Sequence, residues 1–174
     1  MNAFVEILKI LIPAGAVFAA AYLLVKRFLD NDQKRREHEL KKSAQGTITP
    51  LKIQAYERIV IFLERINPNS LVIRVNKNGM SARQLHQELV AAVKSEYEHN
   101  LSQQIYISAG AWELVKTSKE EIIQLINISS SKVAADANSS ELAMMILNIC
   151  ANLGKKLPSD VAIDYIKKEI SQNF

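Results

Sequence analysis

Apolar residues recur at helical spacing over residues 50–66. One face carries six of them: Leu51, Ala55, Ile59, Phe62, Leu63 and Ile66. Thr49 followed by Pro50 is typical of a helix start, with an N-cap and a proline in the first turn. Asn67-Pro68-Asn69 ends the run. The pattern predicts a helix over 50–66 that is buried on more than one side.

Four more helices are predicted after residue 80. Ser81 and Gln84 match a capping box at the start of an apolar stripe that ends near residue 100. Ser108 can cap a helix over about 109–126. Residues 142–153 are almost all apolar and end at Gly154, which predicts a core helix too short for a second membrane span. Pro158 begins the last amphipathic helix.

Two short segments fit no helix clearly. Residues 71–75 are rich in β-branched side chains and precede Asn78-Gly79, so a brief strand and an extended loop are equally consistent. Residues 105–107 leave the same choice open. With no repeat period in the chain, the pattern favours an all-α, bundle-like domain of about five helices with possible short extended segments.

The first 25 residues predict a transmembrane helix. Residues 10–25 carry no charge, and the run reaches residue 7 if Lys9 extends to the headgroups. A cleaved signal peptide is the alternative, but Lys26-Arg27 directly after the apolar run argues against it. The residues expected to span are Ile10, Leu11, Pro13, Gly15, Phe18, Tyr22 and Val25.

Positive charge gathers directly after this run. Seven basic residues follow it within about 20 positions, whereas Lys9 alone precedes it, so the positive-inside rule places the N-terminus outside and the C-terminal domain in the cytosol. The topology-determining residues would be Lys26, Arg27, Lys34, Arg35 and Arg36. The expected organisation is an anchor over 1–25, a charged juxtamembrane helix or stalk over 26–45 and a cytosolic helical domain over 46–174. Docking of the stalk on anionic lipid is an alternative.

The distribution of charge along the chain limits which classes of partner are expected. Residues 1–45 hold eight basic and five acidic residues, and the remainder holds 14 basic and 13 acidic residues. A nearly neutral domain has no field that gathers a polyanion, so we expect no nucleic-acid partner. Cys150 is the single cysteine, so it cannot form an intrachain disulfide, which favours a reducing compartment. Its apolar surroundings would raise the pKa of its thiol.

Candidate chemistry is sparse. Glu96 and His99 stand three apart on a predicted helix and could face one metal ion, but the chain offers one such pair, where carboxylate-bridged sites need two. No phosphate-binding glycine loop, nucleophile motif or metal motif is present, so no catalytic, cofactor-binding or metal residues are assigned and no cofactor is expected. Asn148 and Asn152 are predicted to be buried polar groups that need partners.

Several short motifs carry a family resemblance. They are Tyr56-Glu57-Arg58, Asn67-Pro68, Glu96-Tyr97-Glu98-His99-Asn100, Gln103-Gln104-Ile105-Tyr106 and Trp112. Over most of its length the chain resembles a family of uncharacterised single-span proteins of Bacteroidetes-type bacteria. The resemblance implies a bacterial inner-membrane location and brings no assigned activity.

These observations favour an accessory subunit. We expect a membrane-anchored interaction protein of a larger inner-membrane complex, with lipid and other complex subunits as partners and no activity of its own. A tethered enzyme or small-ligand sensor is the alternative, with Glu96, His99 and Tyr106 as its region and Trp112 as a further interaction residue. A stator-like stalk is a third possibility, opposed by the expected helix breaks at Gly46, Pro50, Pro68 and Pro158.

Overall fold

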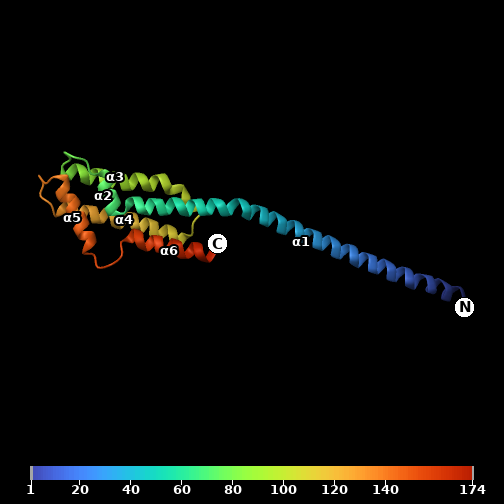
Figure 1. Ribbon diagram of the computed structural model, residues 1–174. Coiled ribbons are helices and arrows are strands. Elements are labelled where there is room, and N and C mark those ends of the chain that lie inside the picture. Colours follow the sequence, from blue (N-terminus) through green and yellow to red (C-terminus); the bar gives the residue numbers. More distant parts are fainter. Residues whose placement is uncertain (1, 174) are drawn as a thin grey trace. The chain divides into compact units, whose positions relative to one another are not determined.

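The computed structural model describes the backbone of residues 2–173. Side chains are described there too, except at residues 2–14, 16, 37–38, 40–41, 44 and 173. Over the described range the chain is helical and forms no strand, so the expected all-α class is confirmed for it. The helices are α1 (Asn2–Ile66), α2 (Pro68–Val75), α3 (Ala82–Asn100), the 3₁₀ helix η1 (Leu101–Ile105), α4 (Ala109–Ser131), α5 (Ser139–Ala151) and α6 (Pro158–Asn173) (Figure 1).

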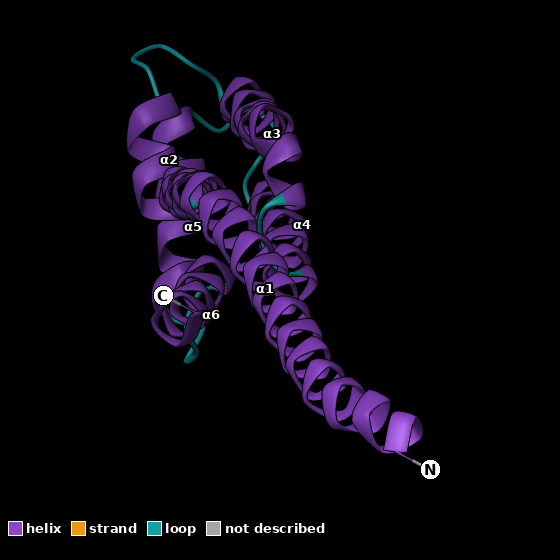
Figure 2. Ribbon diagram, turned by 90° about the vertical axis from the view of Figure 1, so that its right-hand side faces the viewer, coloured by secondary structure: helices purple, strands orange, loops and turns teal. Residues whose placement is uncertain are grey.

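The chain divides into two compact units, Met1–Thr49 and Pro50–Phe174. In the second unit, α4 packs against α3, α5 and α6, and α2 packs against α3 and α5 (Figures 1 and 2). The last turns of α1 add Ile59, Phe62 and Leu63, all without exposed surface, to the same core. Both sites discussed below lie within this second unit.

Side-chain caps fix where these helices begin. Ser81 accepts a hydrogen bond from the Gln84 N–H at 3.2 Å, and the Gln84 side chain accepts one from the Ser81 N–H at 2.9 Å. The predicted capping box is therefore confirmed. Ser108 caps α4 as predicted, accepting from the Ala111 N–H at 3.0 Å. Asn138 forms a second capping box with Glu141, so α5 begins three residues earlier than the apolar pattern indicated.

Residues 71–75, left open between strand and loop, are helical. Pro68 occupies the first turn of α2, and the Asn67 side chain accepts a hydrogen bond from the Asn69 N–H at 3.1 Å. Leu71 and Val72 are buried. The cap and this packing override the β-propensity of the branched side chains. Residues 105–107 likewise form the end of η1 and a turn, not a strand.

The predicted break at the start of the second unit was wrong. Helix α1 passes through Gly46 and Pro50 without interruption. Proline removes one N–H donor, and its ring crowds the carbonyl of Gly46 four residues earlier. The hydrogen bonds on either side continue through the 65-residue helix despite this local loss.

The prediction of a transmembrane helix is also corrected. In the part of the chain that the structure describes, no helix combines the length and apolar character needed to cross a membrane. The uncharged run of sixteen residues amounts to about 24 Å of helix, short of the roughly 30 Å hydrocarbon core. Single-pass membrane topology and inner-membrane localisation, both inferred from this span, are withdrawn with it.

The residues assigned to that span lie along α1. Ile10, Leu11 and Pro13 are outside the residues whose side chains are described. Gly15, Phe18, Tyr22 and Val25 are exposed. The residues assigned to topology are exposed as well, and two of them form ion pairs on the helix surface: Arg35 with Glu39 and Arg36 with Asp32, each at 3.0 Å. These pairs are solvated contacts of the i,i+4 kind.

Candidate ligand pocket and docking groove

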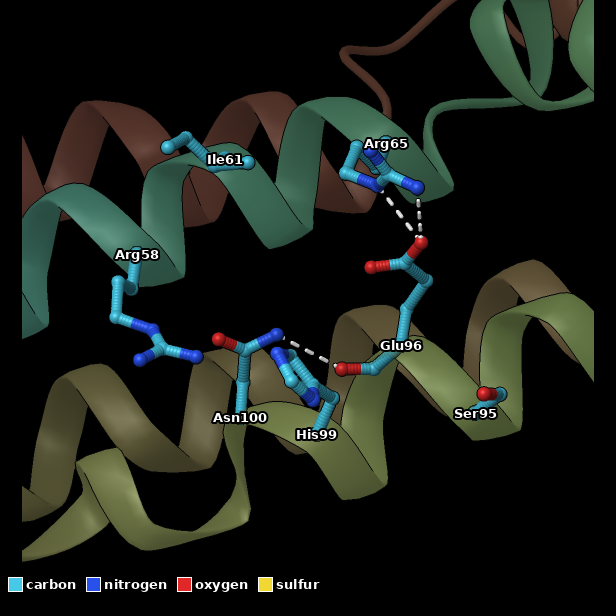
Figure 3. A pocket seen from close by; sticks show the side chains of 7 residues that line it. All are labelled: Arg58, Ile61, Arg65, Ser95, Glu96, His99 and Asn100. Atoms are coloured by element: carbon cyan, nitrogen blue, oxygen red, sulfur yellow. Dashed lines mark hydrogen bonds and ion pairs between the residues drawn. The ribbon is translucent and has the colours of Figure 1, made fainter.

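A polar pocket of about 400 Å³ lies between the end of α1 and the end of α3 (Figure 3). Helix α1 contributes Arg58, Ile61 and Arg65, spaced so that all three fall on one face of the helix. Helix α3 contributes four residues: Ser95, Glu96, His99 and Asn100. The pocket therefore joins two helical stripes that are separated by about 30 residues in the sequence.

The Glu96 carboxylate is the acidic group of this pocket and contacts two arginine side chains. Its Oε1 accepts from Arg65 Nε at 2.7 Å and Nη2 at 2.5 Å, and Arg74 Nη1 of α2 lies 3.5 Å away. Arg74 also donates to the Arg65 carbonyl at 3.0 Å. The buried Asn100 side chain donates to the Glu96 backbone carbonyl at 2.9 Å (Figure 3). These contacts hold one carboxylate between two guanidinium groups.

The four residues predicted for interaction do not form one site. Glu96 and His99 line the pocket, whereas Tyr106 and Trp112 do not. Trp112 stacks on Tyr97 with ring centroids 5.5 Å apart. The Tyr97 ring centroid also lies 6.1 Å from that of Phe62. Lys119 Nζ lies 4.4 Å from the Tyr97 ring centroid. Trp112 thus belongs to an aromatic cluster that joins α1, α3 and α4.

Arg58 and Arg65 were missed by the sequence analysis, although a signal was present. They stand seven apart around Ile61, a spacing that puts all three on one helix face. No pattern within α1 indicates that this face meets Glu96 and His99. Among the described residues, no three His, Cys, Asp or Glu side chains gather as metal ligands would.

A second polar cluster connects α1, α4 and α6. Tyr56 donates to Glu169 Oε1 at 2.6 Å, and Ser108 donates to Glu169 Oε2 at 2.8 Å. Burial and the Glu169 carboxylate together raise the pKa of Tyr56 to about 12. Ser108 is also the α4 cap, so this cluster ties the start of α4 to α1 and α6.

An apolar groove runs along the exposed side of α4, where α5 and α6 meet it. It consists of three hollows of about 370, 260 and 560 Å³ that share lining residues. The first two share Glu121, Lys155 and Pro158. The second and third share Leu114, Lys156 and Val161. Because neighbouring hollows have walls in common, we treat them as one groove.

The lining of this groove combines apolar side chains that are partly open to solvent with five charged ones. Ile128 of α4 is 50% exposed, and Val161 and Tyr165 of α6 are 45% and 42% exposed. Gly110 lines one end, where an added Cβ would lie 2.6 Å from the Tyr165 hydroxyl oxygen. Bulky side chains of α6 therefore approach the α4 backbone at this end.

Two polar predictions for α5 have different outcomes. Asn148 and Asn152 are exposed, so the prediction that they are buried was wrong. Asn152 donates to the Asn148 carbonyl at 2.8 Å and supports the end of the helix. Cys150 is half-buried, and burial raises the pKa of its thiol, as its apolar setting predicted.

Comparison with known proteins shows the family. No curated protein and no solved structure matches the chain. The chain does match a family of unknown function, DUF7935, over residues 2–173. Since that match covers nearly the whole sequence, the chain belongs to the DUF7935 family.

Proposed function

We propose that this protein is a non-enzymatic accessory subunit whose groove on α4, α5 and α6 binds an amphipathic helix of a partner protein. The groove is the observation that carries the proposal, because Ile128, Val161 and Tyr165 line its hollows and are 42–50% exposed. Contiguous exposed apolar surface of this kind is typical of interaction sites. A source among Bacteroidetes-type bacteria, implied by the resemblance, remains part of the proposal.

The dimensions of the groove suit a helix. Its lining on α4 follows one stripe from Gly110 through Leu114, Ser118, Glu121 and Leu125 to Ile128. Eighteen residues of helix correspond to about 27 Å, enough for about five turns of a docked helix. A helix bound in such a groove would place its own apolar anchors three, four and seven residues apart along this length.

The charges at the α6 side favour an acidic partner. Lys156 pairs with Asp164 at 2.6 Å, and this contact, with Lys167 and Lys168 nearby, lowers the Asp164 pKa. Three lysines thus surround one carboxylate. The lining of the groove holds three lysines, Lys155, Lys156 and Lys168, against two carboxylates, Glu121 and Asp164. A partner helix that carries Asp or Glu beside its apolar stripe would complement this excess and suppress binding of basic helices.

Site-directed photocrosslinking of the full chain in its native cells tests the proposal. A photoreactive amino acid replaces Val161 in the groove or, as a matched control, Met144, which is 60% exposed on α5 outside the groove. Mass spectrometry then identifies the crosslinked peptide. We expect position 161, and not 144, to capture a segment with apolar residues at helical spacing and acidic flanks.

Other outcomes overturn the proposal. Crosslinks from position 161 to a second copy of this chain would make the groove a self-association surface. Equal crosslinking from positions 161 and 144 would show that the groove selects no partner. A captured segment without helical apolar spacing would exclude the proposed mode of binding.

A further inference from the structure

The pocket between α1 and α3 carries more positive charge than its own carboxylate neutralises. Arg58 and Arg65 line the pocket, and Arg74 of α2 lies outside the lining but 3.5 Å from Oε1 of Glu96, the one acidic residue in the lining. Arg65 and Arg74 contact Glu96, whose side chain is 17% exposed. The three arginines therefore carry two more charges than this one carboxylate neutralises.

Arg58 is the group with spare binding capacity. Within the described part of the chain it forms no hydrogen bond or ion pair, although it is partly buried and lines the pocket. Figure 3 shows its guanidinium opposite Asn100, whose amide nitrogen is occupied by the Glu96 carbonyl. A guanidinium presents five N–H donors in a planar fork that matches the oxygens of a carboxylate or phosphate.

Contacts within the protein fix the side chains around Arg58. Arg65 is fixed by two contacts to Glu96, and Arg74 braces both residues from α2. Asn100 is buried and tied to its own helix. Such a wall loses little conformational entropy when a ligand binds, which favours affinity for a small molecule.

We propose that this pocket binds a small-molecule oxyanion, a phosphate or carboxylate group, between Arg58 and His99. Arg58 supplies the charge-assisted hydrogen bonds, and Arg65 and Arg74 supply the surrounding positive field. The same charges oppose a metal ion, because Glu96 and His99 would have to hold a cation beside three guanidinium groups. The pocket shares no lining residue with the groove on α4, α5 and α6, so the two proposals are independent.

Calorimetric titration of the full chain tests the site with two probes, inorganic phosphate and succinate, at constant ionic strength. Arg58→Gln removes the unpaired guanidinium. Arg83→Gln is the matched control, since Arg83 is exposed on α3 about 20 Å along the helix from Glu96. We expect saturable binding of at least one probe, about tenfold weaker in R58Q and unchanged in R83Q.

A second variant separates an anion site from a general charge effect. Glu96→Gln removes the carboxylate that competes for Arg65 and Arg74, so the oxyanion should bind several-fold more tightly than in the unmodified chain. Fluorescence of Trp112, the single tryptophan, confirms that each variant is folded. Binding of phosphate alone assigns a phosphoryl ligand, and binding of succinate assigns a carboxylate ligand.

The proposal fails under three results. The first is that neither probe binds with saturation. The second is that R58Q and R83Q weaken binding equally. The third is that E96Q abolishes binding in a variant that is still folded. The last result would indicate that the anion needs Glu96 to hold Arg65 and Arg74 in place, and that surplus positive charge does not carry the site.

Discussion

Helix α1 places the same residue types in two different surroundings. Phe18 is 75% exposed and Phe62 is fully buried, and Tyr22 is 59% exposed whereas Tyr56 is 4% exposed. Both stretches are helical and rich in apolar residues. The difference shows that an apolar run does not reveal its own partner: residues 50–66 are covered by α3 and α6, whereas the described side chains of residues 15–36 are exposed or only partly covered.

The largest difference in the free energy of unfolding is expected between alanine substitutions of the two phenylalanines. Phe62→Ala should lower the free energy of unfolding by about 3–5 kcal/mol, because it empties a packed site beside Tyr97. Phe18→Ala should change it by less than about 0.5 kcal/mol. Urea unfolding followed by Trp112 fluorescence reports on the second unit, where this tryptophan lies. An equal loss from F18A would show that the first stretch is covered in solution.

The two tyrosines should differ by less. Tyr56→Phe removes a hydrogen bond to the Glu169 carboxylate and should cost about 2 kcal/mol at pH 8, whereas Tyr22→Phe should be neutral. The same unfolding assay at pH 8 measures both.

The Tyr56 effect should also depend on pH. Because folding raises the Tyr56 pKa from about 10 to about 12, the fold favours the protonated phenol. The contribution is fully present below pH 10 and is lost as the pH rises towards 12. The advantage of the unmodified chain over Y56F should therefore shrink across this window. A constant difference up to pH 12 would contradict the proposed role of the hydroxyl.

The smallest expected effect compares two ion pairs that involve α1. Glu96→Gln breaks contacts with Arg65 and Arg74 and should cost about 1 kcal/mol, since the Glu96 side chain is 17% exposed. Glu39→Gln breaks the pair with Arg35, in which both side chains are more than 60% exposed, and should cost less than about 0.3 kcal/mol. A double-mutant cycle with Arg65→Gln isolates the pair energy, and a coupling near zero would mean that solvent screens this pair as well.

Local signals in the sequence were enough to place most helices of the second unit. Ser81 with Gln84 and Ser108 supply caps through side chains that are close in sequence, so their function can be read without the fold. The helix over 71–75 was not identified, because burial of Leu71 and Val72 depends on distant parts of the chain. The same reason explains why Asn148 and Asn152 were predicted to be buried although both are exposed.

Local patterns in the sequence predict the all-helical class, the caps at Ser81 and Ser108, and the helix that carries Glu96 with His99. These features depend on contacts within about four residues, which periodicity and propensity capture. The meeting of the two charged faces and the groove left by α4, α5 and α6 become visible in the folded chain alone. The same holds for the packing of Trp112 in the aromatic cluster. Pairing between distant helices depends on how complete faces fit together, and no local pattern encodes that fit.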